Sequence, residues 1–252
     1  PIVTSLYGES DGLNFNPGGQ IAYLSYQGRV NRICTRPTLT SPTETCFIPD
    51  VPGVGWPFWS PDGQWILFYA GSGSSMNLYR SRPDGSELLQ LTHWTTGVAH
   101  RQTWSPDSRQ VAYIYSPSYG EDGQLWVVNL DGTHSPDAVL LENVFGDGQH
   151  VAWSSDGTLL AVPVAGAGIW LVETGREIPW QIPATAAPGE YRSVEWSQTP
   201  TGWPLIYRHR SSDADPWVKY VLLSDQAEPY ALGEVQWGPI WSPDGSVAVL
   251  GS

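Results

Sequence analysis

The sequence predicts an all-β protein, a six-bladed β-propeller whose blades are four-stranded and antiparallel. The first observation is a five-residue segment, Trp59-Ser60-Pro61-Asp62-Gly63, which returns as Trp241-Ser242-Pro243-Asp244-Gly245. The second is that looser copies bring the aromatic positions to 15, 59, 104, 153, 196 and 241, in steps of 44, 45, 49, 43 and 45 residues. The third is that short apolar runs flank the copies. A fixed period in the forties with short strands between the copies is typical of a propeller.

Each copy has the chemistry of a tight turn. Pro61 presets φ, Asp62 accepts hydrogen bonds from nearby backbone N–H groups, and Gly63 accepts the left-handed conformation that ends the turn. We therefore expect each copy to be a hairpin that joins the first two strands of a blade. The six copies span residues 15–19, 59–63, 104–108, 153–157, 196–200 and 241–245.

The aromatic residue that opens each copy is expected to pack between neighbouring blades. A buried Trp removes about 200 Å² from water, which stabilises the fold by about 5 kcal/mol before the entropy cost is subtracted. These tryptophans are therefore interpreted as core residues and not as a ligand site.

The strands are expected in order, four to a blade. A lone strand at 2–7 and a turn at 8–12 come first. The blades are then expected at 13–16, 20–26, 30–36 and 44–48; at 56–60, 65–69, 76–81 and 88–92; at 101–105, 110–115, 125–130 and 139–142; at 151–154, 159–164, 168–173 and 179–182; at 194–197, 204–209, 217–224 and 229–232; and, for the sixth, at 239–242 and 246–250 only.

The incomplete sixth blade needs outer strands. We expect residues 1–252 to form a single domain in which the strand at 2–7 docks on this blade, because a closed ring leaves no exposed sheet edge. The alternative is that further sequence completes the blade. Residue 1 is Pro, which indicates either a processed mature chain or a piece of a longer protein.

The composition excludes several kinds of partner. The chain has 27 Gly, 22 Pro and 14 Trp, so turns and aromatic strands leave little room for helices. Its formal charge is −13, and its 12 basic residues include a single lysine, Lys219. Nucleic acid and anionic membrane surfaces need a basic footprint and are not expected as partners. No apolar run approaches 18 residues, so no membrane insertion is expected.

The two cysteines bear on the compartment. Cys34 and Cys46 are expected on the third and fourth strands of the first blade, across one hairpin. This placement is compatible with a disulfide, which contributes about 3 kcal/mol in the chain-entropy model. The alternative is two free buried thiols. A disulfide favours an extracytoplasmic location, whether periplasmic, cell-surface or secreted.

The repeat resembles that of the TolB-like (WD40-like) propellers. The segments that carry the resemblance are the Trp-Ser-Pro-Asp-Gly hairpin, the strand Trp65-Ile66-Leu67-Phe68, Asn77-Leu78-Tyr79-Arg80 with the turn Pro83-Asp84-Gly85, and the ending Leu89-Gln90-Leu91-Thr92. The resemblance covers essentially the whole chain. It implies the propeller fold, and a function as an interaction scaffold, as the partner of a peptidase domain or, less often, as a lyase, and fold alone does not choose among these.

The residues just before each repeat aromatic are expected to face the central channel. Three residues before it stand Gly12, Trp56, Arg101, His150, Ser193 and Gly238; four before it stand Asp11, Gly55, His100, Gln149, Arg192 and Trp237. The candidate binding residues at this channel mouth are Trp56, His100, Arg101, His150, Tyr191, Arg192 and Trp237. Arginines pair with carboxylates and aromatics stack on flat faces, so the mouth suits an acidic peptide, a carboxylate-bearing sugar or another anion. The alternative is that these side chains plug the channel and bond one another.

Catalytic and metal-binding motifs are missing. There is no Gly-x-Ser-x-Gly, His-Glu-x-x-His, Cys-x-x-Cys or phosphate-binding Gly-Lys segment. Asp213 and Asp215 raise the question of calcium, but their spacing does not match a calcium loop, so a solvated acidic loop is expected. Among the histidines only His100 and His150 are expected to meet. No catalytic residue, metal or other cofactor is therefore expected.

The main hypothesis is a noncatalytic interaction module outside the cytoplasm. It would bind a protein partner, or further copies of itself, through the channel mouth or through faces that expose Trp94, Trp203 or Trp217. The first alternative is a uronate-binding protein or lyase that uses the His, Arg and Trp residues of the mouth. The second is a propeller separated from a peptidase.

Overall fold

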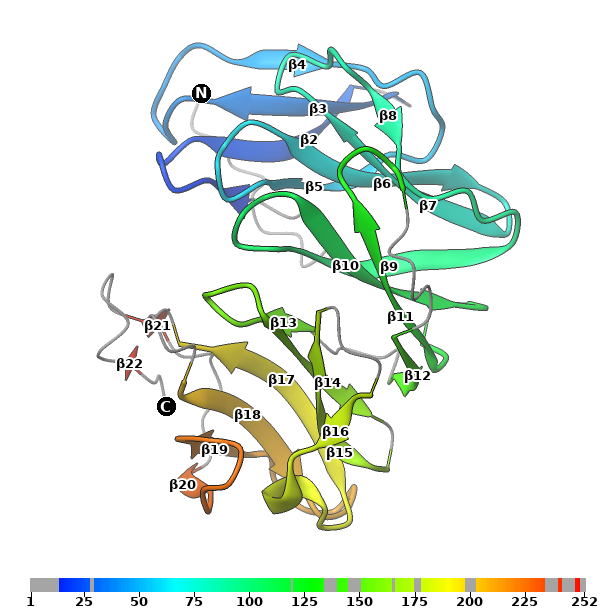
Figure 1. Cartoon of the computed structure of the whole chain (residues 1–252). Coiled ribbons are helices and arrows are strands. Elements are labelled where there is room, and N and C mark those ends of the chain that lie inside the picture. The colour runs from blue at the N-terminus through cyan, green and yellow to red at the C-terminus, as the bar shows by residue number, and fades with distance from the viewer. Residues whose placement is uncertain are drawn as a thin grey trace. The chain divides into compact units, whose positions relative to one another are not determined.

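The computed structural model describes residues 14–27, 30–118, 120–133, 140–144, 151–164, 166–174, 178–197, 203–233, 240–241 and 248–249. These residues form sheets whose strands are mostly antiparallel (Figure 1), and the helical element among them is the three-residue 3-10 helix η1 (Pro183–Thr185). No helix in this part of the chain has the length and the hydrophobicity needed to cross a bilayer. The all-β prediction is confirmed.

Five groups of four strands follow one another along the chain and are here called repeats 1 to 5. They are repeat 1, β1 (Asn14–Phe15), β2 (Ile21–Gln27), β3 (Val30–Arg36) and β4 (Thr45–Phe47); repeat 2, β5 (Gly55–Trp59), β6 (Ile66–Ser72), β7 (Ser75–Ser81) and β8 (Leu89–Gln90); repeat 3, β9 (Gly97–Trp104), β10 (Gln110–Ser116), β11 (Gly123–Asn129) and β12 (Leu141–Val144); repeat 4, β13 (Ala152–Trp153), β14 (Leu159–Val164), β15 (Gly168–Glu173) and β16 (Trp180–Gln181); and repeat 5, β17 (Glu190–Trp196), β18 (Leu205–Arg210), β19 (Val218–Leu222) and β20 (Tyr230–Gly233).

In each of these repeats the strands lie side by side in chain order. Two further strands, β21 (Ile240–Trp241) and β22 (Ala248–Val249), form an antiparallel pair where the sixth blade is expected. The strand expected at 2–7, and with it the predicted closure of the ring, lies outside the described residues.

The chain divides into two compact units, and each is described by itself. The described residues of Pro1–His100, Asp107–Val111 and Val128–Ser135 form unit 1, and those of Arg101–Pro106, Ala112–Val127 and Pro136–Ser252 form unit 2. Within unit 1, β7 and β9 pair in parallel through Ser75 and Gly97. Within unit 2, β12 and β14 pair through Val144 and Val164.

The repeated turn folds as its residues predict. The Gly63 N–H donates to the Ser60 carbonyl at 2.9 Å, and the Gln64 N–H donates to the Asp62 carboxylate at 3.0 Å. Gly63 has φ +70°, the left-handed conformation for which glycine is suited. Ser154–Gly157 repeats the pattern, with the Gly157 N–H on the Ser154 carbonyl at 2.9 Å. The predicted hairpin is confirmed at both copies.

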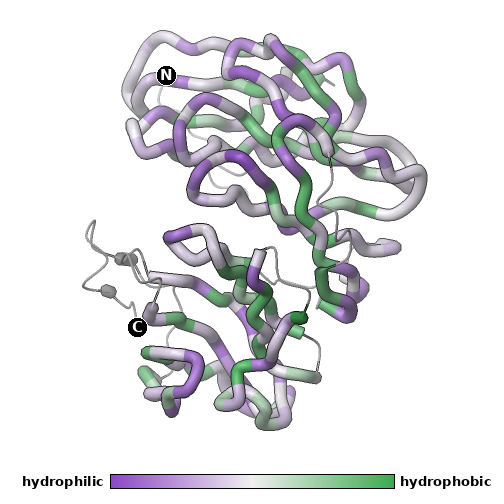
Figure 2. Tube along the Cα trace, viewed as in Figure 1, coloured by the Kyte–Doolittle hydropathy of each residue, from purple (hydrophilic) through white to green (hydrophobic). Residues whose placement is uncertain are grey.

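Three of the repeat tryptophans pack between consecutive repeats, as expected. Trp59 is 5% exposed and packs with Ala22 and Ile33 of repeat 1 and with Ile66 and Phe68 of repeat 2. Trp153 joins the apolar cluster of repeats 3 and 4, and Trp196 joins that of repeats 4 and 5. Figure 2 shows the hydrophobic stretches along strands such as β11 and β14. These three tryptophans are therefore core residues. The prediction is wrong for Phe15, the aromatic of the first copy, which is 53% exposed.

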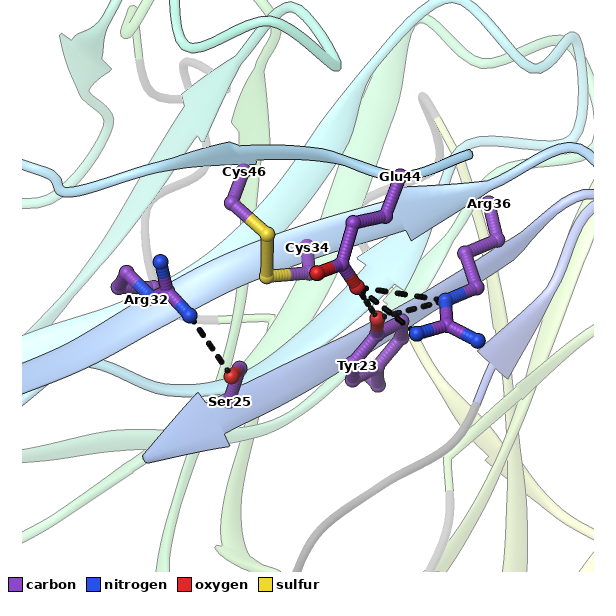
Figure 3. The surroundings of a disulfide bond; sticks show 7 residues. All are labelled: Tyr23, Ser25, Arg32, Cys34, Arg36, Glu44 and Cys46. Carbon is purple, nitrogen blue, oxygen red and sulfur yellow. Dashed lines mark hydrogen bonds and ion pairs between the residues drawn. A yellow bond between two sulfur atoms is a disulfide. The ribbon is translucent and has the colours of Figure 1, made fainter. Parts of the chain in front are cut away.

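The predicted disulfide joins Cys34 and Cys46 and ties β3 to β4 (Figure 3). Next to it, Glu44 accepts hydrogen bonds from the Tyr23 hydroxyl and from Arg36, whose Nη2 lies 3.0 Å from the carboxylate. These bonds from Tyr23 and then Arg36 lower the pKa of Glu44. A covalent bond and an ion pair thus hold the short strand β4 on the sheet.

Acid is expected to destabilise the fold through the carboxylates of its turns. Hydrogen bonds from Ser86 lower the pKa of Asp84, and hydrogen bonds from Thr133 lower that of Asp131. A carboxyl whose pKa is lower in the folded state stabilises the fold above its unfolded pKa of about 4, and this contribution is lost as the pH falls through the folded pKa.

We therefore expect the Tm of the wild type to fall steeply below about pH 4. Asparagine accepts the same turn hydrogen bonds at every pH, so Asp84→Asn with Asp131→Asn should flatten this dependence. The measurement is thermal unfolding by circular dichroism between neutral and acid pH. Parallel curves for wild type and variant would contradict the assignment to these two turns.

Candidate functional site

The predicted channel-mouth residues fall in both units. Trp56, on β5, and His100, on β9, belong to unit 1, whereas Arg101, Tyr191 and Arg192 belong to unit 2. His150 and Trp237 lie outside the described residues. The grouping of all seven around one opening therefore remains a prediction, and the described members are taken within their own units.

The same backbone distortion recurs on the first strand of three repeats. Trp56, Arg101 and Ser193 have φ of +39°, +54° and +55°, although none is glycine. Each stands three residues before its repeat aromatic. In repeats 2 and 5 the strand pairing shifts at this point, between Gly55 and Phe58 and between Arg192 and Glu195. Bulges of this kind change the direction in which side chains point. A non-glycine residue in the left-handed conformation costs about 1–3 kcal/mol and persists only where the surrounding structure holds it, and such residues occur most often at functional sites.

Two of the predicted residues are largely buried. His100 is 2% exposed. Tyr191 is 6% exposed, its hydroxyl donates to the Ala187 carbonyl at 3.0 Å, and its ring lies 4.4 Å from that of His209. Burial raises the pKa of Tyr191. Tyr191 therefore packs in the core between repeats 4 and 5, while Arg192, the next residue on β17, points to the other face of the strand.

Three arginines surround one tryptophan on this other face of repeat 5. The guanidinium carbons of Arg192, Arg208 and Arg210 lie 5.0, 5.4 and 4.8 Å from the centre of the Trp217 ring. We call these four residues the arginine cluster. β17 pairs with β18 so that Arg192 faces Arg208, and the two-residue period of a strand brings Arg210 to the same face. Cations within about 6 Å of an indole ring are attracted by its π system.

Two carboxylates of the described residues pair with the arginine cluster. Glu190 pairs with both Arg192 and Arg210 at 3.1 Å, and Asp213 pairs with Arg210. The Asp213 side chain is 88% exposed, whereas that of Arg192 is 25% exposed and that of Arg210 19%. Counted over the residues that the structure describes, the three arginines and two carboxylates carry a net positive charge, on a protein whose formal charge is −13. Among these two carboxylates the exposed Asp213 is the one most easily displaced, so a carboxylate from outside the chain can take its place on Arg210.

The two aspartates of the acidic loop bind different residues of the protein. Asp213 turns to Arg210, while Asp215 accepts a hydrogen bond from the Ser212 hydroxyl at 2.8 Å. Among the described residues, the acidic and sulfur side chains close enough to hold a metal ion are Cys34, Glu44 and Cys46, and the disulfide occupies both sulfur atoms.

Sequence reasoning found Arg192 and noted Trp217, but it missed Arg208 and Arg210. The alternation Arg208-His209-Arg210 was the available signal, because residues two apart on a strand share a face. Repeat 2 contains a smaller version of the same arrangement. The guanidinium carbons of Arg80 and Arg82 lie 4.0 and 3.8 Å from the centre of the Trp65 ring, and both arginines pair with Glu87.

Next to the arginine cluster lies the single lysine of the chain. Lys219 pairs across β18 and β19 with Arg208 and is 2% exposed. Burial lowers the pKa of Lys219 and raises that of Glu195, and the attraction between these two charges opposes both shifts. The charges of Lys219 and Glu195 therefore attract each other in a partly desolvated part of repeat 5.

Unit 1 carries a second candidate site, a hollow of about 330 Å³ between repeats 1 and 2. We call it the Trp56 hollow. Its volume is at the lower end of the range for ligand pockets, roughly 300–1,000 Å³. The lining side chains that matter below are Tyr26, Asn31, Trp56, Tyr69 and Met76.

The architecture of these sheets is that of a β-propeller. The propeller domain of the Trilobed protease from Pyrococcus furiosus aligns with 89% of this chain and 72% of its own, at a TM-score of 0.58 and 14% identity. A GH74 enzyme from Niastella koreensis aligns with 88% of this chain and 38% of its own, at a TM-score of 0.63 and 11% identity. At such identities the likeness concerns the fold alone, and it includes propellers that belong to enzymes.

Within this class the chain resembles TolB, as its repeat motif predicts. It is 27% identical over 77 residues to the Tol-Pal system protein TolB of Francisella tularensis subsp. mediasiatica, a match that covers 31% of this chain and 18% of the relative. A structure from Agrobacterium tumefaciens assigned as TolB aligns with 95% of this chain and 88% of its own, at a TM-score of 0.59 and 17% identity. No protein-family model matches the chain.

Proposed function

We propose that this chain is a noncatalytic protein-interaction module that works outside the cytoplasm and binds an acidic segment of a protein partner. We further propose that it forms one six-bladed TolB-like propeller over residues 1–252, with the strand at 2–7 completing the sixth blade. The TolB-like repeat supports a protein-interaction module, because the similar protein of Francisella tularensis is named as a component of the Tol-Pal system. The disulfide between Cys34 and Cys46 supports an oxidising compartment.

The observation that carries the binding role is the arginine cluster. Guanidinium groups bind carboxylates through paired, charge-assisted hydrogen bonds, and Arg with Trp are the residues that most often dominate interface energies. A carboxylate of the partner replaces Asp213 on Arg210 and extends to Arg192.

The test measures binding of a fluorescein-labelled Glu-rich peptide by anisotropy. We expect Arg192→Gln with Arg210→Gln to weaken binding at least about tenfold, which corresponds to about 1.4 kcal/mol. We also expect the affinity to fall with added salt, because the contacts are ionic. The matched control is Arg80→Gln with Arg82→Gln, which removes two arginines from the other Arg–Trp arrangement and is expected to leave binding unchanged.

Co-purification then connects the peptide to a natural partner. Wild type and both double variants are purified from the native envelope fraction, and co-eluting chains are identified by mass spectrometry. The proposal predicts a defined protein that is lost only with Arg192→Gln and Arg210→Gln. It is wrong if the peptide binds both double variants equally, or if an oligogalacturonate binds the cluster and the peptide does not, which would favour the uronate alternative.

A further inference from the structure

The Trp56 hollow contains a strained backbone position that its neighbours hold in place. Trp56 has φ +39°, and its ring meets that of Tyr69 edge-on, at 5.0 Å between centres and 79° between planes. The preceding residue, Gly55, pairs with Tyr69 across the strands. A Cβ at Gly55 would lie 2.4 Å from the Tyr69 ring, so glycine is what lets this ring lie on the backbone. Strain of this kind persists where the surrounding structure fixes it, and it points to a binding role.

The side of the Trp56 hollow that repeat 1 forms is hydrogen-bonded to the segment just before Trp56. The Asn31 side-chain amide donates to the Val54 carbonyl at 3.0 Å and so joins β3 to the segment that leads into β5. Tyr26, on β2, is 53% exposed at the rim. The hollow is therefore framed by Trp56 and Tyr69 from repeat 2 and by Tyr26 and Asn31 from repeat 1.

The side chains that line the Trp56 hollow favour an uncharged ligand. Among the described residues that line the hollow, none carries a charge at neutral pH, in contrast to the arginine cluster. The perpendicular rings of Trp56 and Tyr69 form a corner that offers an aromatic face next to an aromatic edge. A pyranose ring matches such a corner, because its C–H face packs on an aromatic ring while its hydroxyls reach the phenol and amide groups. A proline ring has the apolar face but lacks the hydroxyls.

We propose that the Trp56 hollow is a binding site for a neutral carbohydrate, one or two pyranose units in size. The sugar lies against Trp56 and Tyr69, Tyr26 covers its outer side, and Asn31 accepts a hydroxyl hydrogen bond through its side-chain oxygen. The site goes beyond the proposed partner binding and uses none of the residues of the arginine cluster.

The test titrates the purified full chain with cellobiose and with N,N′-diacetylchitobiose, using saturation-transfer NMR and calorimetry. We expect at least one of the two sugars to bind, and we expect Trp56→Gly to weaken that binding at least about tenfold. Glycine removes the ring and adopts a positive φ without strain, so we expect the variant to keep its fold. Tyr26→Ala should also weaken binding, whereas Tyr230→Ala, which removes a 62% exposed tyrosine of unit 2, should not.

The remaining outcomes overturn the proposal. It is wrong if neither sugar gives a saturation-transfer signal at millimolar concentration, if a sugar binds the Trp56→Gly and Tyr26→Ala variants as well as the wild type, or if an oligoproline peptide binds in a Trp56-dependent way and the sugars do not. Arg192→Gln with Arg210→Gln should leave sugar binding intact, so failure of the peptide experiment and failure of this one are separable.

Discussion

Replacing Trp196 by alanine is expected to lower the free energy of unfolding by about 3–5 kcal/mol, the usual cost of truncating a large buried aromatic. Trp196 is 4% exposed and packs with Leu171 of repeat 4 and Leu205 of repeat 5. Its indole N–H donates to the Ala152 carbonyl at 2.9 Å. Alanine would remove the apolar contact between two repeats and leave that carbonyl without its donor.

The measurement is urea unfolding followed by circular dichroism, with Trp170→Ala as the matched control. Trp170 also donates its indole N–H to a carbonyl, that of Ala167 at 3.0 Å, but it is only half-buried. We expect the control to cost about 1 kcal/mol, because less apolar surface is lost. A cost below about 1.5 kcal/mol for Trp196→Ala would contradict the role of the repeat aromatics as the packing between repeats.

The sequence predicts most strands because two local signals agree. The turn motif fixes where hairpins lie, and apolar alternation marks the strands on either side of it. The strand limits of β3, β14 and β15 are predicted residue for residue, and the Cys34–Cys46 bond is predicted from one hairpin. The start of β9 at Gly97 and that of β17 at Glu190 are missed by four residues each, because the Trp motif marks only the end of those strands.

The candidate site is harder to predict from the sequence because it depends on the register in which neighbouring strands pair. Aligning the repeats on their aromatic finds the position of Trp56, Arg101 and Ser193, yet the left-handed backbone that these three share is visible only in the structure. Similarly, Arg208 joins Arg192 only because the ladder between β17 and β18 places it opposite Arg192, and Arg210, opposite Glu190, lies on the same face. A shift by one residue would send the same side chains to the other face.

The second prediction with a large expected effect on stability concerns Lys219, the buried lysine of repeat 5. Lys219→Met is expected to lower the free energy of unfolding by about 3 kcal/mol, because the partly desolvated carboxylate of Glu195 loses the positive charge that attracts it. The value lies at the lower end of the range for such pairs, since Glu195 is only half-buried. Replacing both residues, as Lys219→Met with Glu195→Leu, should recover most of the loss, because an apolar pair of similar volume carries no desolvation cost.

The pH dependence separates this charge effect from a simple packing defect. Burial raises the pKa of Glu195 in the folded state, and Lys219 opposes the rise. Without the lysine the folded pKa rises further above its unfolded value of about 4.3, so the penalty acts above that folded pKa and disappears as the pH falls through it. The gap in stability between Lys219→Met and wild type should therefore narrow as urea unfolding is repeated from pH 7 toward pH 4. A gap that stays constant with pH, or a double variant no more stable than Lys219→Met, would mean that Lys219 acts through its volume and not through its charge.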